Sequence, residues 1–380
     1  MTEKRAIGPD ILRGLAILLV MSWHTPWTEY PALFQHIKDF GWLGVDIFFV
    51  LSGYLIGTEL LRPVRAGQAP DLVVFYLKRA FRILPVFWLI LVVYALFPVL
   101  RERETLSPLW RYLTFTLNFG LDAKTYGALT HAWSLCVEEH FYLILPLLVQ
   151  ILRRFRTPWS AILLGGMVLI GGMVLRHSIW QTWAAGHGDS AAFFTRFYYP
   201  SYNRLDGLLI GVCMAALRLF YPDMWARFAR PRFTLPLAIL CLGITGYMNQ
   251  IDGVILSEQG SVIFYPLFSL GVACLLATLL ETERYLQPMR PSGLGYIAAI
   301  SYSLYLSHKI VIHLDDLYLP RAWMTGWPQI AIYYVTSITV ASILHFAVER
   351  TFMQMRNRVL VRMKKPPQKT EAAFNSIASD

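Results

Sequence analysis

Two ionisable residues interrupt an apolar stretch near the start of the chain, ILRGLAILLVMSWHT at positions 11–25. Arg13 and His24 lie eleven residues apart, which on an α-helix is a rise of about 16.5 Å and only about 20° more than three full turns. Alone, Arg13 could be a snorkelling anchor and His24 a packed core residue. Their shared helix face favours a functional pair, because a guanidinium binds anions and an imidazole transfers protons or accepts an acyl group.

Further ionisable residues lie in or beside other apolar stretches, where each costs about 2.5–3.5 kcal/mol at mid-membrane and marks a candidate functional site. Glu138 and Glu139 occur in THAWSLCVEEHFYLILPLL, and one of them could meet a histidine or an arginine of a neighbouring helix. Arg79 and Arg82 precede an apolar stretch in FYLKRAFRILP, where they suit phosphate capture or simply set the topology. Asp46, in GWLGVDIFFVLSGYLIG, requires a buried cation as its partner.

A second group of candidates shares a polar or ionisable side chain at a weaker position in these segments. We assign to acceptor binding or to support of the site Asp46, Ser52, Tyr54, Arg204, Asp206, Tyr305 and His308. Arg204 and Asp206 could pair with each other or line an outer cavity, and Tyr305 and His308 are spaced to share a helix face. The four cysteines all fall within apolar segments, so we expect neither a disulfide framework nor a metal site.

The composition places these residues in a membrane. Of the 380 residues, 56% are hydrophobic and only 15% are charged, against about 25% in soluble domains. Segments near the roughly 20 residues that a membrane span requires recur along the chain. We therefore predict an all-α polytopic membrane protein with about ten transmembrane helices, at 9–27, 40–61, 83–100, 132–152, 158–176, 203–221, 234–250, 260–280, 293–313 and 327–348.

The distribution of positive charge predicts the orientation. With the N-terminus inside, the inner segments hold 22 Lys and Arg and the outer segments hold 8, so both termini are expected in the cytoplasm. The net charge of +10 therefore reflects topology, and no nucleic-acid partner is expected. We predict a transmembrane domain at 1–355 and a polar, disordered cytoplasmic tail at 356–380.

Taken in order, these motifs resemble the acyltransferase-3 family of membrane O-acyltransferases over about residues 8–355. The resemblance rests on the R-x10-H pattern of Arg13 and His24, on GVDIFFVLSGYLI, on the R-x-x-R of Arg79 and Arg82, on AWSLCVEEHFYLILPLL, and on RLDGLLIG and SYSLYLSH. The chain departs from the family at His140, where Gln is common, and after YLSH, where KIV replaces a frequent W-P. It resembles the stand-alone type, without an SGNH domain.

The resemblance implies an enzyme of the bacterial inner (plasma) membrane. It would move an acyl group, usually acetyl, from cytoplasmic acyl-CoA to a hydroxyl of a carbohydrate or glycolipid at the outer face, as in modification of surface or exopolysaccharides. Acyl-CoA would be a substrate, with no permanently bound cofactor. Arg13, Arg79 and Arg82 would bind CoA. His24 would act as a general base or as a covalent acyl carrier, supported by Glu138 or Glu139.

Two alternatives remain open. The acceptor could be a secondary metabolite such as a macrolide. A transporter or flippase of glycans would also place charged residues within its spans. Inverted repeats with broken helices would favour a transporter, and the sequence shows no such pairing.

Overall fold

The computed structural model describes residues 6–26, 28–155, 158–185, 189–252, 257–287 and 293–364. The first half of the chain forms α1 (Ile7–His24), α2 (Ala32–Asp39), α3 (Gly44–Arg65), α4 (Leu72–Leu96), α5 (Leu109–Leu113), α6 (Trp133–Leu152), α7 (Pro158–Ala185) and α8 (Ser190–Phe193). The second half forms α9 (Asp206–Phe220), α10 (Pro222–Phe228), α11 (Pro231–Asp252), α12 (Glu258–Glu281), α13 (Glu283–Leu286), α14 (Gly293–Tyr318), α15 (Gly326–Leu344) and α16 (Arg350–Lys364). Short 3-10 helices include η1 (Gly41–Leu43) and η3 (Thr130–Ala132), and two π-helices are η5 (Phe194–Tyr198) and η9 (His345–Glu349).

Within these ranges, eight helices are long and apolar enough to cross a membrane, and the bent pair α9–α10 would add a ninth. This result confirms the predicted all-α polytopic membrane protein. The predicted span at 9–27 corresponds to α1, an 18-residue helix that contains Asp10 and Arg13 and is not among these eight. Because α1 packs against α3, α12 and α14, its polar residues lie among other helices.

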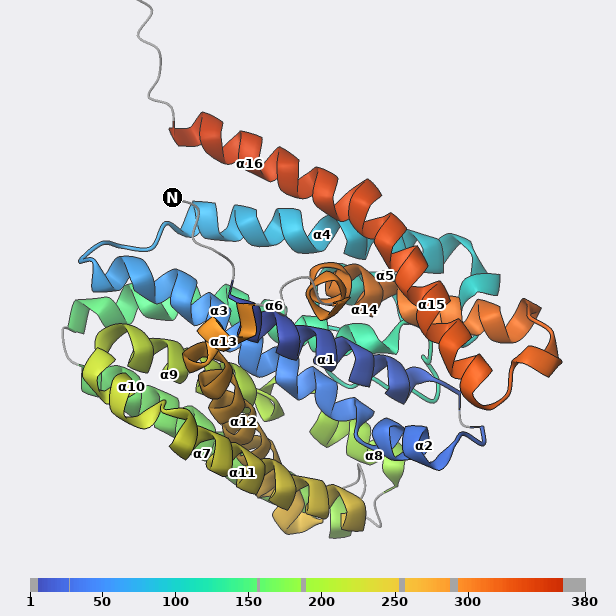
Figure 1. Cartoon of the computed structure of the whole chain (residues 1–380), viewed down its shortest axis with the longest axis horizontal. Helices are drawn as coiled ribbons and strands as arrows, with labels where there is room; N and C mark the ends of the chain where they lie inside the picture. Colours follow the sequence, from blue (N-terminus) through green and yellow to red (C-terminus); the bar gives the residue numbers. More distant parts are fainter. Residues whose placement is uncertain are drawn as a thin grey trace, which may run out of the picture.

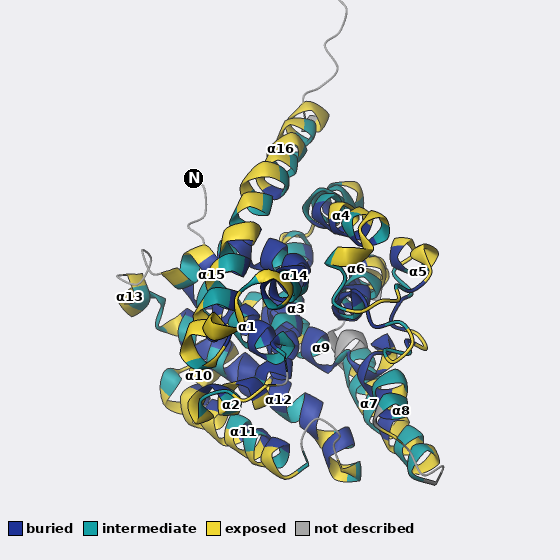
Figure 2. Ribbon diagram, turned by 90° about the vertical axis from the view of Figure 1, so that its right-hand side faces the viewer, coloured by how far each residue is buried: buried dark blue, intermediate teal, exposed yellow. Residues whose placement is uncertain are grey.

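The centre of the bundle is formed by α1, α3 and α14 (Figures 1 and 2). In the apolar stretches of α3 and α14, 72% of the residues are buried, whereas in that of α7 only 6% are buried. In both views α4 and α16 lie along one side of this centre, and α7, α11 and α12 lie on the opposite side. Polar residues on the central helices are therefore held by packing on most sides.

Glycines allow the closest helix contact, between α3 and α9. A Cβ atom added at Gly53 would lie 2.0 Å from the carbonyl oxygen of Leu208, and one added at Gly211 would lie 2.3 Å from that of Val50. Any larger residue at either position would force the two helices apart. This crossing brings the start of α3, with Asp46, close to the loop that precedes α9 and carries Arg204.

The predicted start of the third span was wrong. The third span was expected at residue 83, but α4 already begins at Leu72, because the Asp71 side chain caps it by accepting from the Val74 backbone N–H. The helix continues through Pro85, so Arg79 and Arg82 lie on a helix and not in the preceding loop.

The predicted tail at 356–380 begins within α16, which extends to Lys364 and packs along α4 (Figure 1). A neighbouring helix gives this polar segment a surface to fold against, which composition alone does not reveal. Residues 365–380 lie outside the described part of the chain.

Candidate active site

Two cavities within the bundle share Val45 and Tyr305 in their linings. The larger, which we call the inner cavity, has a volume of about 610 Å³, and the smaller outer cavity about 190 Å³. Helix α1 lines both, with Arg13 in the inner cavity and His24 in the outer one. The two residues of the R-x10-H pattern thus line two different cavities, Arg13 the inner one and His24 the outer one.

The inner cavity brings together the three predicted anion-binding arginines. Arg13 enters from α1, and Arg79 and Arg82 enter from α4. Arg79 forms an ion pair with Glu59 of α3 at 2.5 Å, and Lys78 joins the same carboxylate at 2.8 Å. Guanidinium groups from two helices, facing one cavity, suit the phosphates of a polyanionic ligand. Glu59 was missed in the sequence, although an ionisable residue near the end of the predicted span at 40–61 was an available signal.

The adjacent carboxyl groups of α6 face different surroundings. Glu138 lines the inner cavity and accepts a hydrogen bond of 2.5 Å from Ser52, another predicted residue in the same lining. Glu139 is not part of either lining, and its Oε1 is buried without a hydrogen-bond partner among the described residues. Of the two, Glu138 therefore faces a cavity, but this is the inner cavity and not the one that His24 lines.

The partner of His24 is another histidine. Its Nδ1 lies 2.9 Å from Nε2 of His308, which α14 supplies. The expectation that Glu138 or Glu139 orients His24 is thus not what the geometry shows. His308, assigned only to support of the site, contacts the proposed reacting residue directly.

This contact defines the proton positions of both rings in their neutral forms. Nδ1 of His308 lies 3.0 Å from the carbonyl oxygen of Leu304, which can only accept, so this nitrogen carries the proton. Nε2 of His308 then accepts from Nδ1–H of His24. The remaining nitrogen of His24, Nε2, keeps its lone pair, and the residue lines the outer cavity. An imidazole in this tautomer can act as a base or as a nucleophile.

A third histidine, His131, was missed. Its ring centre lies 5.9 Å from that of His24 and 5.3 Å from that of His308. It lines the outer cavity, and both ring nitrogens are buried without a hydrogen-bond partner in the part of the chain that the structure describes. Buried polar groups are normally satisfied, so this ring is a candidate contact for a substrate. Its position just before WSLCVEEH was the available signal.

A cation also borders the outer cavity. Lys309 lines it and forms an ion pair with Glu102 at 2.7 Å, and the Tyr94 hydroxyl donates to the same carboxylate. Burial raises the pKa of Glu102, but the Lys309 charge and the hydrogen bonds from Lys309 and Tyr94 together hold the pKa of that carboxyl below its usual value. The segment between α4 and α6 is thereby tied to α14 beside His308.

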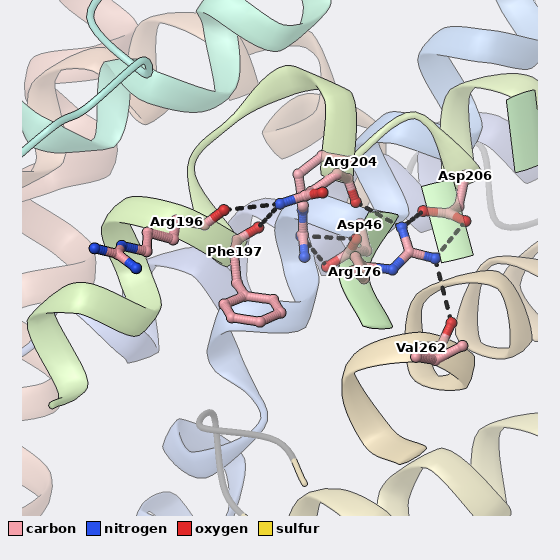
Figure 3. A network of polar contacts seen from close by, with 8 residues as sticks. Asp46, Arg176, Arg196, Phe197, Arg204, Asp206 and Val262 are labelled. Carbon is pink, nitrogen blue, oxygen red and sulfur yellow. Dashed lines mark hydrogen bonds and ion pairs between the residues drawn. The ribbon is translucent and has the colours of Figure 1, made fainter. Parts of the chain in front are cut away.

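Two buried ion pairs lie near the outer ends of α3 and α9 (Figure 3). Arg204 donates from Nη2 to both oxygens of Asp46, at 2.9 and 2.8 Å, and its guanidinium carbon lies 4.0 Å from the centre of the Tyr265 ring. Asp206 pairs with Arg176 of α7 at 2.8 Å rather than with Arg204. Arg176 was missed, because it stands at the last position of a predicted span. These predicted residues brace helices together.

Of the two remaining predicted residues, one lines the cavities and the other does not. Tyr305 lines both cavities. Tyr54 lines neither, and its hydroxyl accepts a hydrogen bond from Arg218 of α9, which assigns it to helix packing.

The fold and the site define an integral membrane protein with an enzyme-like centre, because a partly buried imidazole with an available lone pair lines one cavity and an arginine cluster lines the cavity that adjoins it. Residues 7–346 match the family model described as an acyltransferase domain. The chain therefore belongs to the acyltransferase-3 family.

Curated proteins of two bacteria are similar to the chain. The peptidoglycan O-acetyltransferase OatA of Listeria monocytogenes is 28% identical over 338 residues, which cover 83% of this chain and 51% of that protein. The O-acetyltransferase OatA of Staphylococcus aureus is 26% identical over 368 residues, covering 89% of this chain and 55% of that protein. The chain thus spans about half the length of these relatives. No solved structure matches it.

Proposed function

We propose that this protein is an O-acetyltransferase of the bacterial plasma membrane. It transfers the acetyl group of cytoplasmic acetyl-CoA to a hydroxyl of a carbohydrate at the outer face. The observation that carries the proposal is the pair of adjoining cavities, with arginines in one and His24 in the other. Family membership favours acyl transfer over transport. The name of the Listeria relative, a peptidoglycan O-acetyltransferase, supports a carbohydrate acceptor.

The lining of the inner cavity supports acyl-CoA as the donor. CoA carries several phosphates, which Arg13, Arg79 and Arg82 would bind at the cytoplasmic end. Its pantetheine arm is long and narrow, and the rise of about 16.5 Å between Arg13 and His24 is of matching scale. Binding the phosphates at the arginines would direct the thioester toward His24.

The chemistry at His24 follows from its tautomer. Nε2 removes the proton of the acceptor hydroxyl as that oxygen attacks the thioester carbonyl, and the C–S bond then breaks. The CoA thiolate takes up the proton from the imidazolium, so that the products are an acetyl ester and free CoA. In a covalent variant, Nε2 attacks the thioester carbonyl and displaces the CoA thiolate. The acceptor hydroxyl then attacks the acetyl-imidazole, which frees Nε2, and the hydroxyl proton passes to the thiolate. His308 holds the required tautomer in either case.

The test uses inverted membrane vesicles from cells that produce the protein, since these expose the cytoplasmic face and retain the natural acceptor. Radiolabelled acetyl-CoA added outside the vesicles should label a base-labile ester in the vesicle carbohydrate. Vesicles from cells in which the gene is deleted are the control. Equal labelling of the two preparations would contradict the proposal.

A further inference from the structure

The boundary between the two cavities consists of identifiable side chains. On α14, Tyr302 lines only the inner cavity and Lys309 only the outer one, while Tyr305 lines both. On the α3 side, Phe48 lines the inner cavity, and Val45 lines both. Tyr305 and Val45 are thus the side chains common to the two linings, and a group passing from one cavity to the other must pass them.

Tyr305 is held firmly in this position. Its hydroxyl donates to the carbonyl oxygen of His131 at 2.5 Å and lies 2.6 Å from Oγ of Ser134. Its ring is buried, with its centre 5.4 Å from that of His131. These contacts tie α14 to the start of α6. A buried, hydrogen-bonded aromatic ring is a rigid wall, because few of its torsions remain free.

The position of this wall matters for the reaction. His24 lines only the outer cavity, and the three arginines line only the inner one. An acyl thioester that is anchored by phosphates at the arginines and reacts at His24 therefore carries its acyl group past Tyr305. Only the acyl end of the donor needs to cross this point.

We propose that Tyr305, together with Val45, forms a size filter that sets which acyl groups reach His24. This inference rests on the proposed function. The filter admits an acetyl group, and each added methylene meets the ring of Tyr305 and the branched side chain of Val45. A pocket wall of this kind discriminates by about 10–200-fold per methylene. The hydroxyl contacts to His131 and Ser134 keep the ring in place.

The test compares radiolabelled acetyl-CoA and propionyl-CoA as donors in inverted vesicles from producing cells, with vesicles from deletion cells as background. Tyr305→Ala should raise the ratio of propionyl to acetyl ester by about tenfold or more. Val45→Ala removes less volume and should raise it in the same direction, which provides a second route if Tyr305→Ala fails to fold. Val45→Phe should lower acetyl transfer while CoA binding to the purified protein stays unchanged.

Tyr302→Ala is the matched control. Tyr302 lies on the same helix, and its hydroxyl also donates to a backbone carbonyl, that of Ile83 at 2.7 Å, but it lines only the inner cavity. Its substitution should leave the propionyl-to-acetyl ratio unchanged. An unchanged ratio in Tyr305→Ala and Val45→Ala, with the wild type active, would overturn the filter. Absence of acetyl ester from the wild type would instead overturn the proposed function.

Discussion

The ion pair of the inner cavity and the ion pair that braces the start of α3 differ in their exposure to solvent. The Arg79–Glu59 pair of the inner cavity keeps side-chain exposures of 22% and 26%, whereas the Arg204–Asp46 pair near the outer end has 0% and 4%. A partly solvated pair can exchange partners when an anion enters, because its charges are already accessible. A fully buried pair cannot do so without leaving a charge unpaired. On the proposed function, ionisable residues in apolar helices serve two purposes in this protein, ligand capture in the inner cavity and bracing between helices.

The histidine cluster differs from both ends. His24 and His308 contact each other without a carboxylate between them. His24 donates to His308, and His308 donates to the backbone carbonyl of Leu304. A backbone carbonyl fixes the position of one proton without introducing a negative charge. On the proposed function, the reacting nitrogen is therefore oriented by α14 itself.

The largest effect is expected from loss of the His308 ring. His308→Ala removes the acceptor that fixes the tautomer of His24, and ester formation in vesicles should fall by about 10²-fold or more. The affinity of the purified protein for CoA should stay unchanged, because the arginines are untouched. His308→Gln offers an amide oxygen to Nδ1–H of His24 and should recover part of the activity. Equal activity of the alanine variant and the wild type would remove His308 from the mechanism.

Breaking the outer brace should affect stability. Asp46→Ala leaves Arg204 buried without its carboxylate and should destabilise the fold by about 3–5 kcal/mol, measured from the denaturation midpoint in detergent. The double variant Asp46→Leu/Arg204→Met removes both charges and should recover most of this loss. If the single and double variants unfold alike, the pair does not act as a brace.

Removal of one inner arginine should affect binding more than stability. Arg79→Ala and Arg82→Ala should each weaken CoA binding by about 10–100-fold, since a hydrogen bond to a charged group contributes about 1.5–3 kcal/mol. Calorimetry of the purified variants measures this change, and increasing salt should reduce the difference from the wild type. Arg227→Ala, at an exposed position of α10, is the matched control. Wild-type affinity in both cavity variants would refute their assigned role.

The smallest effect concerns the loop that follows His24. Lys38 of α2 is buried and donates from Nζ to the Thr25 carbonyl and, at 2.9 Å, to both the Thr25 hydroxyl and the Pro26 carbonyl. Burial lowers the pKa of Lys38 to about 8, although Asp39 opposes the change. In the unfolded chain its pKa is about 10.4, so between these values the unfolded state binds more protons and folding stability rises with pH.

The corresponding measurement is the thermal unfolding midpoint as a function of pH. The wild type should gain stability relative to Lys38→Met between about pH 8 and about pH 10.4, with a constant difference below pH 8. Parallel curves across this range would show that the ammonium of Lys38 is not desolvated in the fold.

The sequence predicted the features that depend on local periodicity. Membrane helices require long apolar stretches, and the common stripe of Arg13 and His24 requires only helical geometry. The start of α4 was misplaced because Pro85 resembles a helix start, whereas the actual cap at Asp71 lies in a polar stretch.

Pairings between distant segments could not be predicted. His24 and His308 are separated by 284 positions, and no local pattern joins them. Arg204 was expected to pair with Asp206 or to line a cavity, but tertiary packing gives it Asp46 and gives Asp206 to Arg176. His131 lies in a single 3-10 turn with no periodic signal, and its role becomes visible only when α6 and α14 are brought together.

The central claim is that a donor bound at the inner arginines reacts at His24. It is tested most directly by adding radiolabelled acetyl-CoA to inverted vesicles that contain His24→Ala, and by measuring CoA binding to the same purified variant. The account predicts that ester labelling falls to the level of deletion vesicles, while CoA affinity equals that of the wild type. Wild-type ester labelling in the His24→Ala vesicles would contradict it.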